Sequence, residues 1–292
     1  MRTPTNFLFL RDWPRRIRRW LPLFLLVSSF PISALQLPAP TSLIKNAGLR
    51  PQTVEVIEPH AATSERPVRV AYVGIPIKTI LKEWFGDAWQ APNVEVLFLA
   101  EDGYAYAIPA AKLASQPAYL TYARADGKPF ELDNWEQREH VPLAPYYLVW
   151  DNLTAPDLRH DGSSGWPYQV TRIKLRQPGD DAALRLPNAD LETALGMKDT
   201  EANCLTCHHL RGFGGEKFPE DLTASLCRWS PADLQRWIHE PARFRPGTIM
   251  PALNRAWPDE ERRLVAARIA RYLNAIKQSD PKVCEGNTPL QQ

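Results

Sequence analysis

The sequence has few of the side chains that bind metals through sulfur or nitrogen. Its 292 residues include only four cysteines, three methionines and six histidines, and no cysteine precedes Cys204. A thiolate-bound metal is therefore excluded from the long stretch before that residue, since soft thiolate ligation needs cysteine. No second Cys-x-x-Cys pair or spaced histidine pair follows Cys204, so the four-ligand pattern of a structural zinc site is also missing.

Glycine and long apolar runs are scarce as well. Fourteen glycines stand against twenty-eight prolines, which predicts stiff connections and a loop-rich fold. The apolar run at residues 20–30 is shorter than the ~20 residues that span a bilayer. Six arginines precede this run, and the small residues Ser33 and Ala34 close it. We therefore expect residues 1–34 to be a cleaved signal peptide for export, with an uncleaved membrane anchor as the alternative.

A large excess of charge of either sign is also absent. The whole chain carries a formal net charge of +2, from 35 basic and 33 acidic residues. Without residues 1–34, which hold six arginines and one aspartate, 29 basic and 32 acidic residues are left. The mature chain would be slightly acidic, so its composition does not predict nucleic acid as a partner. We expect an exported chain of this kind in the bacterial periplasm.

Composition divides the rest of the chain into five segments. Residues 35–66 are rich in Pro, Ala and Thr and are expected to form an extended leader. Residues 67–177 carry strand signals, residues 178–189 form a polar linker, and residues 190–278 have helical periodicity. Residues 279–292 are a C-terminal tail. The sequence therefore predicts an α+β protein of two domains, in which a mixed, strand-dominated domain precedes an all-α domain.

Turn and capping signals support this division. Asp102-Gly103 between two apolar runs predicts a hairpin, because this pair adopts the positive φ angles of a tight turn. Residues 230–233, Ser-Pro-Ala-Asp, predict a helix start with a hydroxyl cap and an acid three positions later. A buried stripe between Val265 and Ile276 predicts a long final helix.

Residues 204–208, Cys-Leu-Thr-Cys-His, form the most informative motif. Two cysteines three positions apart can add both thiols to the vinyl groups of one haem, and the adjacent histidine then faces the iron. A thioredoxin-like redox pair would lie in a βαβ setting, which the pattern does not show. We predict one covalent haem c at Cys204 and Cys207, with His208 as the proximal iron ligand. Zinc or dithiol chemistry is the alternative.

The distal iron ligand follows by elimination among the methionines. The initiator methionine leaves with the signal, and Met197 lies too near the attachment loop to reach over the ring. Met250 lies 42 residues after His208 in a Pro-Gly-Thr-Ile-Met-Pro segment that two prolines stiffen. We predict Met250 as the distal ligand. His239, His209 or an open site are the alternatives, and a core methionine is the plain structural interpretation.

Between about residues 190 and 278 the chain resembles a class I cytochrome c domain. The matching segments, in chain order, are residues 204–208, Gly214-Gly215, 218–223, 234–241, 244–252 and Tyr272-Leu273. The resemblance implies an α-helical shell around a buried haem that transfers single electrons. By position, Pro219 resembles the proline that orients the proximal histidine. Tyr272 resembles the aromatic residue at which the terminal helices cross.

Histidine and methionine ligation has consequences for the chemistry. A soft thioether and a buried site both favour ferrous iron and so raise the reduction potential. Because both axial positions are filled, no position is left for a substrate, and we expect an electron relay. Arg243, Arg245 and Arg255 flank Met250 and would guide an acidic partner, unless they are ordinary solvated charges.

Two cysteines, Cys227 and Cys284, are left over. An even leftover pair in an oxidising compartment predicts a disulfide, with two unpaired thiols as the alternative. Such a bond would tie the C-terminal tail to the haem domain and stabilise the fold by about 4 kcal/mol through loop closure.

Residues 68–176 resemble, more weakly, the molybdopterin-binding domain of sulfite-oxidase-like proteins. The resemblance is carried by residues 74–76, 94–108, 125–129, 145–150 and 166–173. In catalytic members of that family a cysteine thiolate binds molybdenum, and this region has no cysteine. The resemblance therefore implies the fold without metal or pterin, and we expect no molybdopterin. Asp151, His160 and Asp161 near Trp166 are candidates for lining a surviving pocket.

The sequence thus predicts a periplasmic monohaem c-type cytochrome that transfers single electrons, without catalysis of its own. It would act as a carrier or as the haem subunit of a dehydrogenase complex, between a donor dehydrogenase and an acceptor cytochrome or oxidase. It would meet the membrane only if the signal is retained as an anchor. The alternatives are a complete molybdenum-dependent oxidoreductase of the sulfite type with an attached haem domain, and a haem-based ligand sensor with an open iron site.

Overall fold

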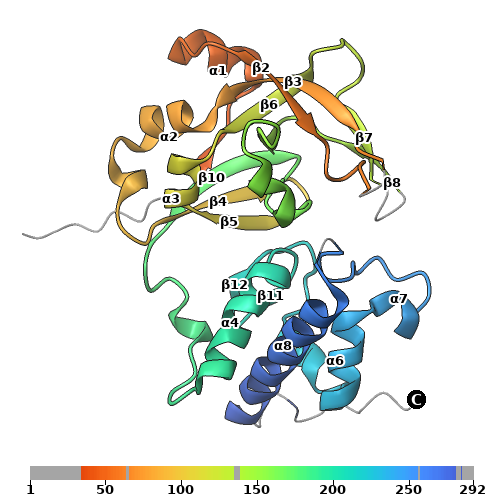
Figure 1. Ribbon diagram of the computed structural model, residues 1–292. Coiled ribbons are helices and arrows are strands. Elements are labelled where there is room, and N and C mark those ends of the chain that lie inside the picture. The colour runs from red at the N-terminus through yellow and green to blue at the C-terminus, as the bar shows by residue number, and fades with distance from the viewer. Residues whose placement is uncertain (1–33, 64–65, 135–138, 256, 281–283, 285–292) are drawn as a thin grey trace, which may run out of the picture. The chain divides into compact units, whose positions relative to one another are not determined.

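The computed structural model describes residues 34–63, 66–134, 139–255, 257–280 and 284. These residues belong to one compact unit, whose helices and strands are labelled in Figure 1. Their buried apolar side chains form two separate hydrophobic cores. The first core lies among strands, and we call residues 34–176 the strand-rich lobe. The second lies among helices, and we call residues 182–280 the helical lobe.

Two antiparallel four-stranded sheets build the strand-rich lobe. The first has the order β1-β10-β4-β5, with β1 at Leu35–Gln36, β10 at Val170–Arg176, β4 at Glu95–Ala100 and β5 at Ala105–Pro109. The second has the order β2-β3-β6-β9, with β2 at Gln52–Ile57, β3 at Arg69–Pro76, β6 at Ala118–Arg124 and β9 at Tyr147–Trp150. A separate pair joins β7 (Glu131–Asn134) to β8 (Glu139–Pro142). Alternate strand residues point into a shared core, as the period of two requires.

Short helices and 3-10 turns connect these strands. They are α1 (Pro40–Ala47), α2 (Ile77–Phe85) and α3 (Ala110–Ser115), with 3-10 turns η1 (Ala88–Gln90) and η2 (Pro156–Asp161). β4 and β5 form the hairpin that Asp102-Gly103 predicts, and Gly103 has a φ of 88°. Only a residue tolerant of positive φ can turn the chain here, which is why glycine occupies the position.

The segment expected to be an extended leader, residues 35–66, is built into the strand-rich lobe. It supplies β1, α1 and β2, and β2 pairs with β3 along its whole length. Leu43, Val54 and Val56 from this segment are buried in the first core. The burial of these apolar side chains outweighs the Pro, Ala and Thr content that suggested an extended leader.

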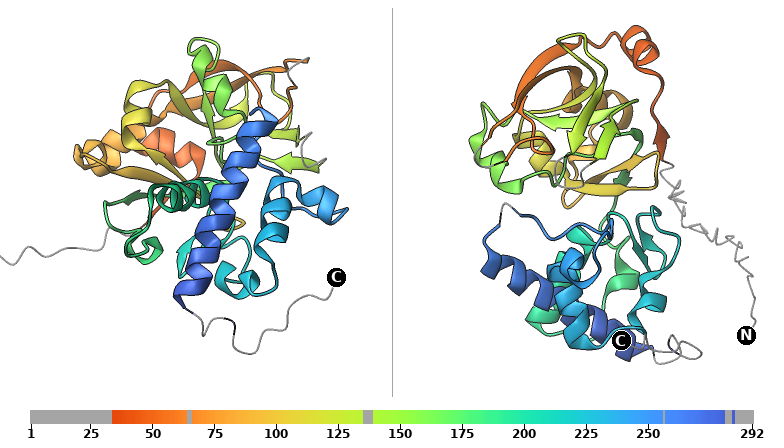
Figure 2. Two further views of the ribbon diagram at one scale, coloured as in Figure 1. Left: turned by 60° about the horizontal axis from the view of Figure 1, so that its bottom comes forward. Right: turned by 90° about the vertical axis from the view of Figure 1, so that its right-hand side faces the viewer.

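Five helices build most of the helical lobe. They are α4 (Leu191–Asn203), α5 (Leu222–Leu226), α6 (Pro231–His239), α7 (Pro241–Phe244) and α8 (Asp259–Ser279), preceded by the 3-10 turn η3 (Ala182–Leu184). Helix α8 packs against both α4 and α6, and Figure 2 shows this long helix from two further sides. Ser230 caps α6 by accepting a hydrogen bond from the backbone N–H of Asp233 at 3.1 Å.

Helices α4 and α8 approach closely because α4 carries a glycine at the contact. A Cβ on Gly196 would lie 2.2 Å from the carbonyl oxygen of Arg268 and 2.9 Å from the Cβ of Tyr272. Tyr272 therefore lies where α4 and α8 cross. Its hydroxyl donates to the carbonyl of Leu184 at 2.7 Å, which fixes the segment expected to be a polar linker against the second core.

The expectation of an all-α second half is wrong, and with it the predicted fold class. Directly after residue 208, β11 (His209–Leu210) pairs antiparallel with β12 (Phe213–Gly214). The two residues between these strands, Arg211 and Gly212, both have positive φ angles, which is the backbone of a tight two-residue hairpin. The chain as a whole is mixed α/β, with strand-rich sheets first and helices towards the C-terminus.

Part of the predicted organisation lies outside the described residues. This holds for the signal peptide at residues 1–34, apart from Ala34, and for most of the tail at 279–292. Within the part of the chain that the structure describes, no helix is long and apolar enough to cross a membrane.

Candidate functional site

The motif at residues 204–208 forms a tight turn at the end of α4. Cys204 is the C-cap of α4, and its backbone N–H donates to the carbonyl of Thr200 at 2.8 Å. The N–H groups of Cys207 and His208 then both donate to the carbonyl of Cys204, at 3.2 and 3.0 Å. The structure thus brings both cysteines and the histidine together on one short, hydrogen-bonded turn.

Two glycines close this turn from the other side. The N–H of Gly215 donates to the carbonyls of both Leu205 and His208, at 2.8 and 3.0 Å. A Cβ on Gly215 would lie 2.3 Å from the carbonyl oxygen of Thr206, and one on Gly214 would lie 2.4 Å from that of His208. No side chain fits at either position, so the Gly-Gly pair is a steric requirement of the turn.

The two thiols of the turn are free, in contrast to the other two cysteines. Burial raises the pKa of the Cys204 thiol to about 12, and the neighbouring Cys207 and Asp199 add to the effect. Burial also raises the pKa of Cys207. Reactive cysteines of redox enzymes have lowered pKa values and react as thiolates, so this environment does not favour the dithiol alternative.

The imidazole of His208 is oriented by an aromatic neighbour. The ring of Phe218 stacks on it with the centroids 5.0 Å apart, and the N–H of Phe218 donates to the carbonyl of Cys207 at 3.2 Å. Burial lowers the pKa of His208, and the adjacent His209 contributes to the shift. A neutral imidazole is the form that ligates a metal. Pro219, to which the family resemblance assigns the orienting role, follows Phe218 at an exposed position.

Met250 comes from a different segment, the irregular stretch between α7 and α8. It is partly buried, and its N–H donates to the hydroxyl oxygen of Thr248 at 3.2 Å. Its neighbour Ile249 is 74% exposed, whereas Leu253 is buried in the second core. This stretch is held at Leu253 and leaves a hydrophobic side chain exposed beside the methionine.

The two histidines considered as alternative ligands have acidic neighbours. The Nε2 of His239 lies 3.1 Å from Oδ1 of Asp259 at the start of α8. The Nε2 of His209 lies 3.9 Å from Oδ2 of Asp221. The contact of His239 is a hydrogen bond, whereas that of His209 is too long to be one. Among the described residues, the buried Nδ1 of His209 has no hydrogen-bond partner.

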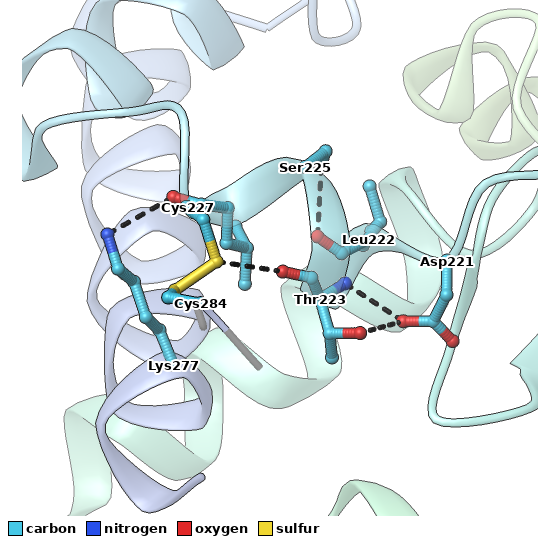
Figure 3. The surroundings of a disulfide bond; sticks show 8 residues. Asp221, Leu222, Thr223, Ser225, Cys227, Lys277 and Cys284 are labelled. Carbon is cyan, nitrogen blue, oxygen red and sulfur yellow. Dashed lines mark hydrogen bonds between the residues drawn. A yellow bond between two sulfur atoms is a disulfide. The ribbon is translucent and has the colours of Figure 1, made fainter. Parts of the chain in front are cut away.

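Cys227 and Cys284 form a disulfide (Figure 3). The bond joins the end of α5 to the segment after α8, across a sequence separation of 57 residues. Asp221 caps α5 by accepting from the N–H of Thr223 at 2.9 Å, and Lys277 of α8 donates to the carbonyl of Leu226 at 3.3 Å. These contacts and the disulfide hold α5 against the last helix.

The residues expected to line a surviving pocket in the strand-rich lobe serve different structural roles. Asp151 accepts a hydrogen bond from the N–H of Thr154 at 3.0 Å, and Asp161 pairs with Lys112 at 2.6 Å. His160 is exposed in η2. Asp151 and Asp161 are thus each used in a local contact.

A buried carboxylate in the strand-rich lobe was not among the expected functional residues. Glu58 is fully buried and accepts hydrogen bonds from the hydroxyls of Tyr72 and Tyr147, at 2.7 and 2.9 Å. The N–H of His60 donates to the same carboxylate at 3.1 Å. Burial and the nearby Glu58 raise the pKa of both tyrosines, so these hydroxyls stay protonated and act as donors.

Within the described residues, no three His, Cys, Asp or Glu side chains gather as a metal-binding group. This criterion does not apply to the predicted iron ligands, because they are one histidine and one methionine. Comparison with protein-family models finds no match for the chain, and comparison with curated proteins finds no significant match.

Proposed function

We propose that the protein is an exported monohaem c-type cytochrome that relays single electrons between redox partners. The observation that carries the proposal is the turn at residues 204–208, which presents two free thiols and a neutral, stacked imidazole within five residues. When bound, haem iron supplies one-electron redox chemistry by cycling between its ferrous and ferric forms.

The residues of the turn fit such a group. Cys204 and Cys207 would hold it through two thioether bonds, and neither thiol is used in a disulfide. His208 would ligate the iron, with its ring orientation set by Phe218. Residues behind a metal-ligating histidine commonly fix its orientation in this way.

Met250 is the preferred second ligand. The thioether of methionine is a neutral, soft donor that raises the reduction potential of haem iron. Met250 is only partly buried, in the irregular segment between α7 and α8, which leaves its thioether available, whereas the Nε2 of His239 is hydrogen-bonded to Asp259. If His208 and Met250 both hold the iron, no ligand position would be left for a substrate. An electron relay fits this arrangement better than an enzyme or a ligand sensor does.

The disulfide supports a location outside the cytoplasm. Structural disulfides persist in oxidising compartments such as the bacterial periplasm, and Cys227 and Cys284 form one. We infer that the donor is a dehydrogenase and the acceptor a cytochrome or oxidase. Arg243 and Arg245 are exposed beside Phe244 and Ile249, and a surface of this composition suits an acidic protein partner.

The strand-rich lobe is best interpreted as a structural and docking part of the same cytochrome. It has no cysteine, and its candidate pocket residues Asp151 and Asp161 are used in local contacts. These observations give no support to a molybdenum centre, for which a thiolate ligand would be needed.

Cysteine-to-serine variants test the proposal. The protein is produced with c-type maturation, and covalent haem is measured by mass and by haem absorbance. Cys204→Ser and Cys207→Ser should each lose one thioether bond, and the double variant should carry no covalent haem. The control is the Cys227→Ser/Cys284→Ser double variant, which removes the same number of sulfurs but should keep a full haem complement. Equal haem content in the two double variants would refute the proposal.

A further inference from the structure

Both loops that carry the proposed iron ligands are hydrogen-bonded to the strand-rich lobe. At the first loop, the N–H of Ala105 donates to the carbonyl of Thr206 at 2.8 Å, inside the haem-attachment motif. The N–H of Glu216 donates in return to the carbonyl of Gly103, also at 2.8 Å. Lys217 forms an ion pair with Asp102 at 2.8 Å. The turn between β4 and β5 is thus hydrogen-bonded and ion-paired to the loop at residues 204–217, which carries the haem-attachment motif.

The fit at this first contact is close enough to exclude side chains. A Cβ on Gly103 would lie 2.7 Å from the carbonyl carbon of Glu216. The carbonyl oxygen of Gly103 lies 3.1 Å from the position of a Cβ on Gly215. Backbone therefore packs on backbone, and the geometry of the turn is coupled to that of the loop without flexible side chains between them.

The second contact involves the loop that carries Met250. Asn254, four residues after Met250, donates a hydrogen bond from its Nδ2 to the carbonyl of Asp161 at 3.1 Å. Gly162 follows Asp161 with a φ of 58°, and a Cβ there would lie 2.8 Å from Oδ1 of Asn254. The asparagine amide therefore lies directly against the backbone at the end of η2.

Asp161, whose carbonyl accepts this hydrogen bond, is itself held in place by its side chain. The carboxylate of Asp161 pairs with Lys112 of α3 at 2.6 Å, and the same lysine lies over the ring of Trp150 at 5.0 Å. The indole N–H of Trp150 donates to the carbonyl of Gly165 at 2.8 Å. Asn254 is thus anchored to a packed part of the strand-rich lobe.

The segment between α7 and α8, which we call the methionine loop, has no regular secondary structure to hold Met250 in place. Between the end of α7 at Phe244 and the start of α8 at Asp259 the backbone is irregular. A thioether is a neutral ligand without a charge to hold it at the iron, so its bond depends on how well the loop presents the sulfur. Residues that fix a ligand-bearing loop therefore influence both ligation and potential.

We propose that Asn254 is a positioning residue for Met250: its hydrogen bond to the carbonyl of Asp161 lets the strand-rich lobe hold the methionine loop for ligation and so sets the reduction potential. This inference rests on the proposed function. It also assigns the strand-rich lobe a role, namely to brace the two loops that bear the iron ligands.

Two substitutions at Asn254 test the inference on the haem-loaded full chain. Asn254→Ala removes the amide, and Asn254→Asp keeps the shape but loses the N–H donor. Both should lower the midpoint potential. Both should also weaken the charge-transfer band that marks methionine bound to ferric iron. The control is Asn274→Ala, which removes an amide that donates to the carbonyl of Ala270 within α8, at 2.8 Å. It should leave potential and band at wild-type values.

The outcomes separate this inference from the proposed function. If wild-type protein carries no haem, the proposed function fails. If wild-type protein carries haem with methionine ligation, but both Asn254 variants keep its potential and band, the positioning role is refuted. Thermal unfolding of each variant is measured alongside. A lowered melting temperature with unchanged potential and band would mean that Asn254 only stabilises the fold, which also overturns the inference.

Discussion

The two lobes of the molecule differ in the surroundings of two polar sites, the carboxylate of Glu58 and the thiols of Cys204 and Cys207. In the strand-rich lobe, the buried Glu58 is surrounded by donors from Tyr72, Tyr147 and His60. In the helical lobe, the thiols of Cys204 and Cys207 form no disulfide, and Cys207 accepts a hydrogen bond from the hydroxyl of Thr206 at 3.8 Å. Buried polar groups that are fully hydrogen-bonded stabilise a fold, whereas groups left available can bind a cofactor. The comparison agrees with the proposal that the redox chemistry lies in the helical lobe and that the strand-rich lobe supports it.

The largest expected effect is on iron ligation in the helical lobe. Met250→Ala should abolish methionine ligation, lower the midpoint potential and open the ferrous iron to carbon monoxide. Met197→Ala is the control, because Met197 lies on α4, packed against the second core. Absorbance spectra with and without carbon monoxide measure the change. An unchanged spectrum in Met250→Ala would mean that another residue is the ligand.

The disulfide should contribute next most strongly, and to stability alone. Its 57-residue separation predicts a loss of about 4 kcal/mol in the free energy of unfolding when both cysteines are replaced by serine, from loop-closure entropy. Denaturant titration of oxidised wild-type and variant protein measures the loss. Haem content should not change. A variant as stable as wild type would show that the bond adds nothing beyond the contacts around α5.

A smaller effect is expected from the buried carboxylate of the strand-rich lobe. Glu58→Leu leaves the hydroxyls of Tyr72 and Tyr147 without their acceptor, and we expect a loss of about 3 kcal/mol from these unsatisfied groups. Glu58→Gln keeps one oxygen acceptor and should lose less. Denaturant titration gives both values, and haem absorbance serves as the second readout. Loss of haem with unchanged stability would contradict the division of roles between the lobes.

Local patterns in the sequence were enough to find the candidate site. The motif at 204–208 and the stiff segment around Met250 are contiguous, and each carries its chemistry within a few residues. The same holds for the hairpin at Asp102-Gly103 and for the cap at Ser230, where one or two residues determine the local backbone.

Contacts between distant residues could not be predicted in the same way. The two tyrosine partners of Glu58 lie 14 and 89 residues away, and Asn254 meets Asp161 across 93 residues. The pair β11–β12 is too short to show a period of two, and only the turn at Arg211-Gly212 hints at it. The all-α expectation failed at that point because two-residue strands leave no periodic signal.

The most direct test of the central claim is a redox titration of the purified mature protein, with its metal content determined on the same sample. The account predicts one iron per chain, no molybdenum, and a single one-electron transition with the spectrum of covalently bound haem. A colourless protein with unmodified thiols at Cys204 and Cys207, or one with stoichiometric molybdenum, would contradict it.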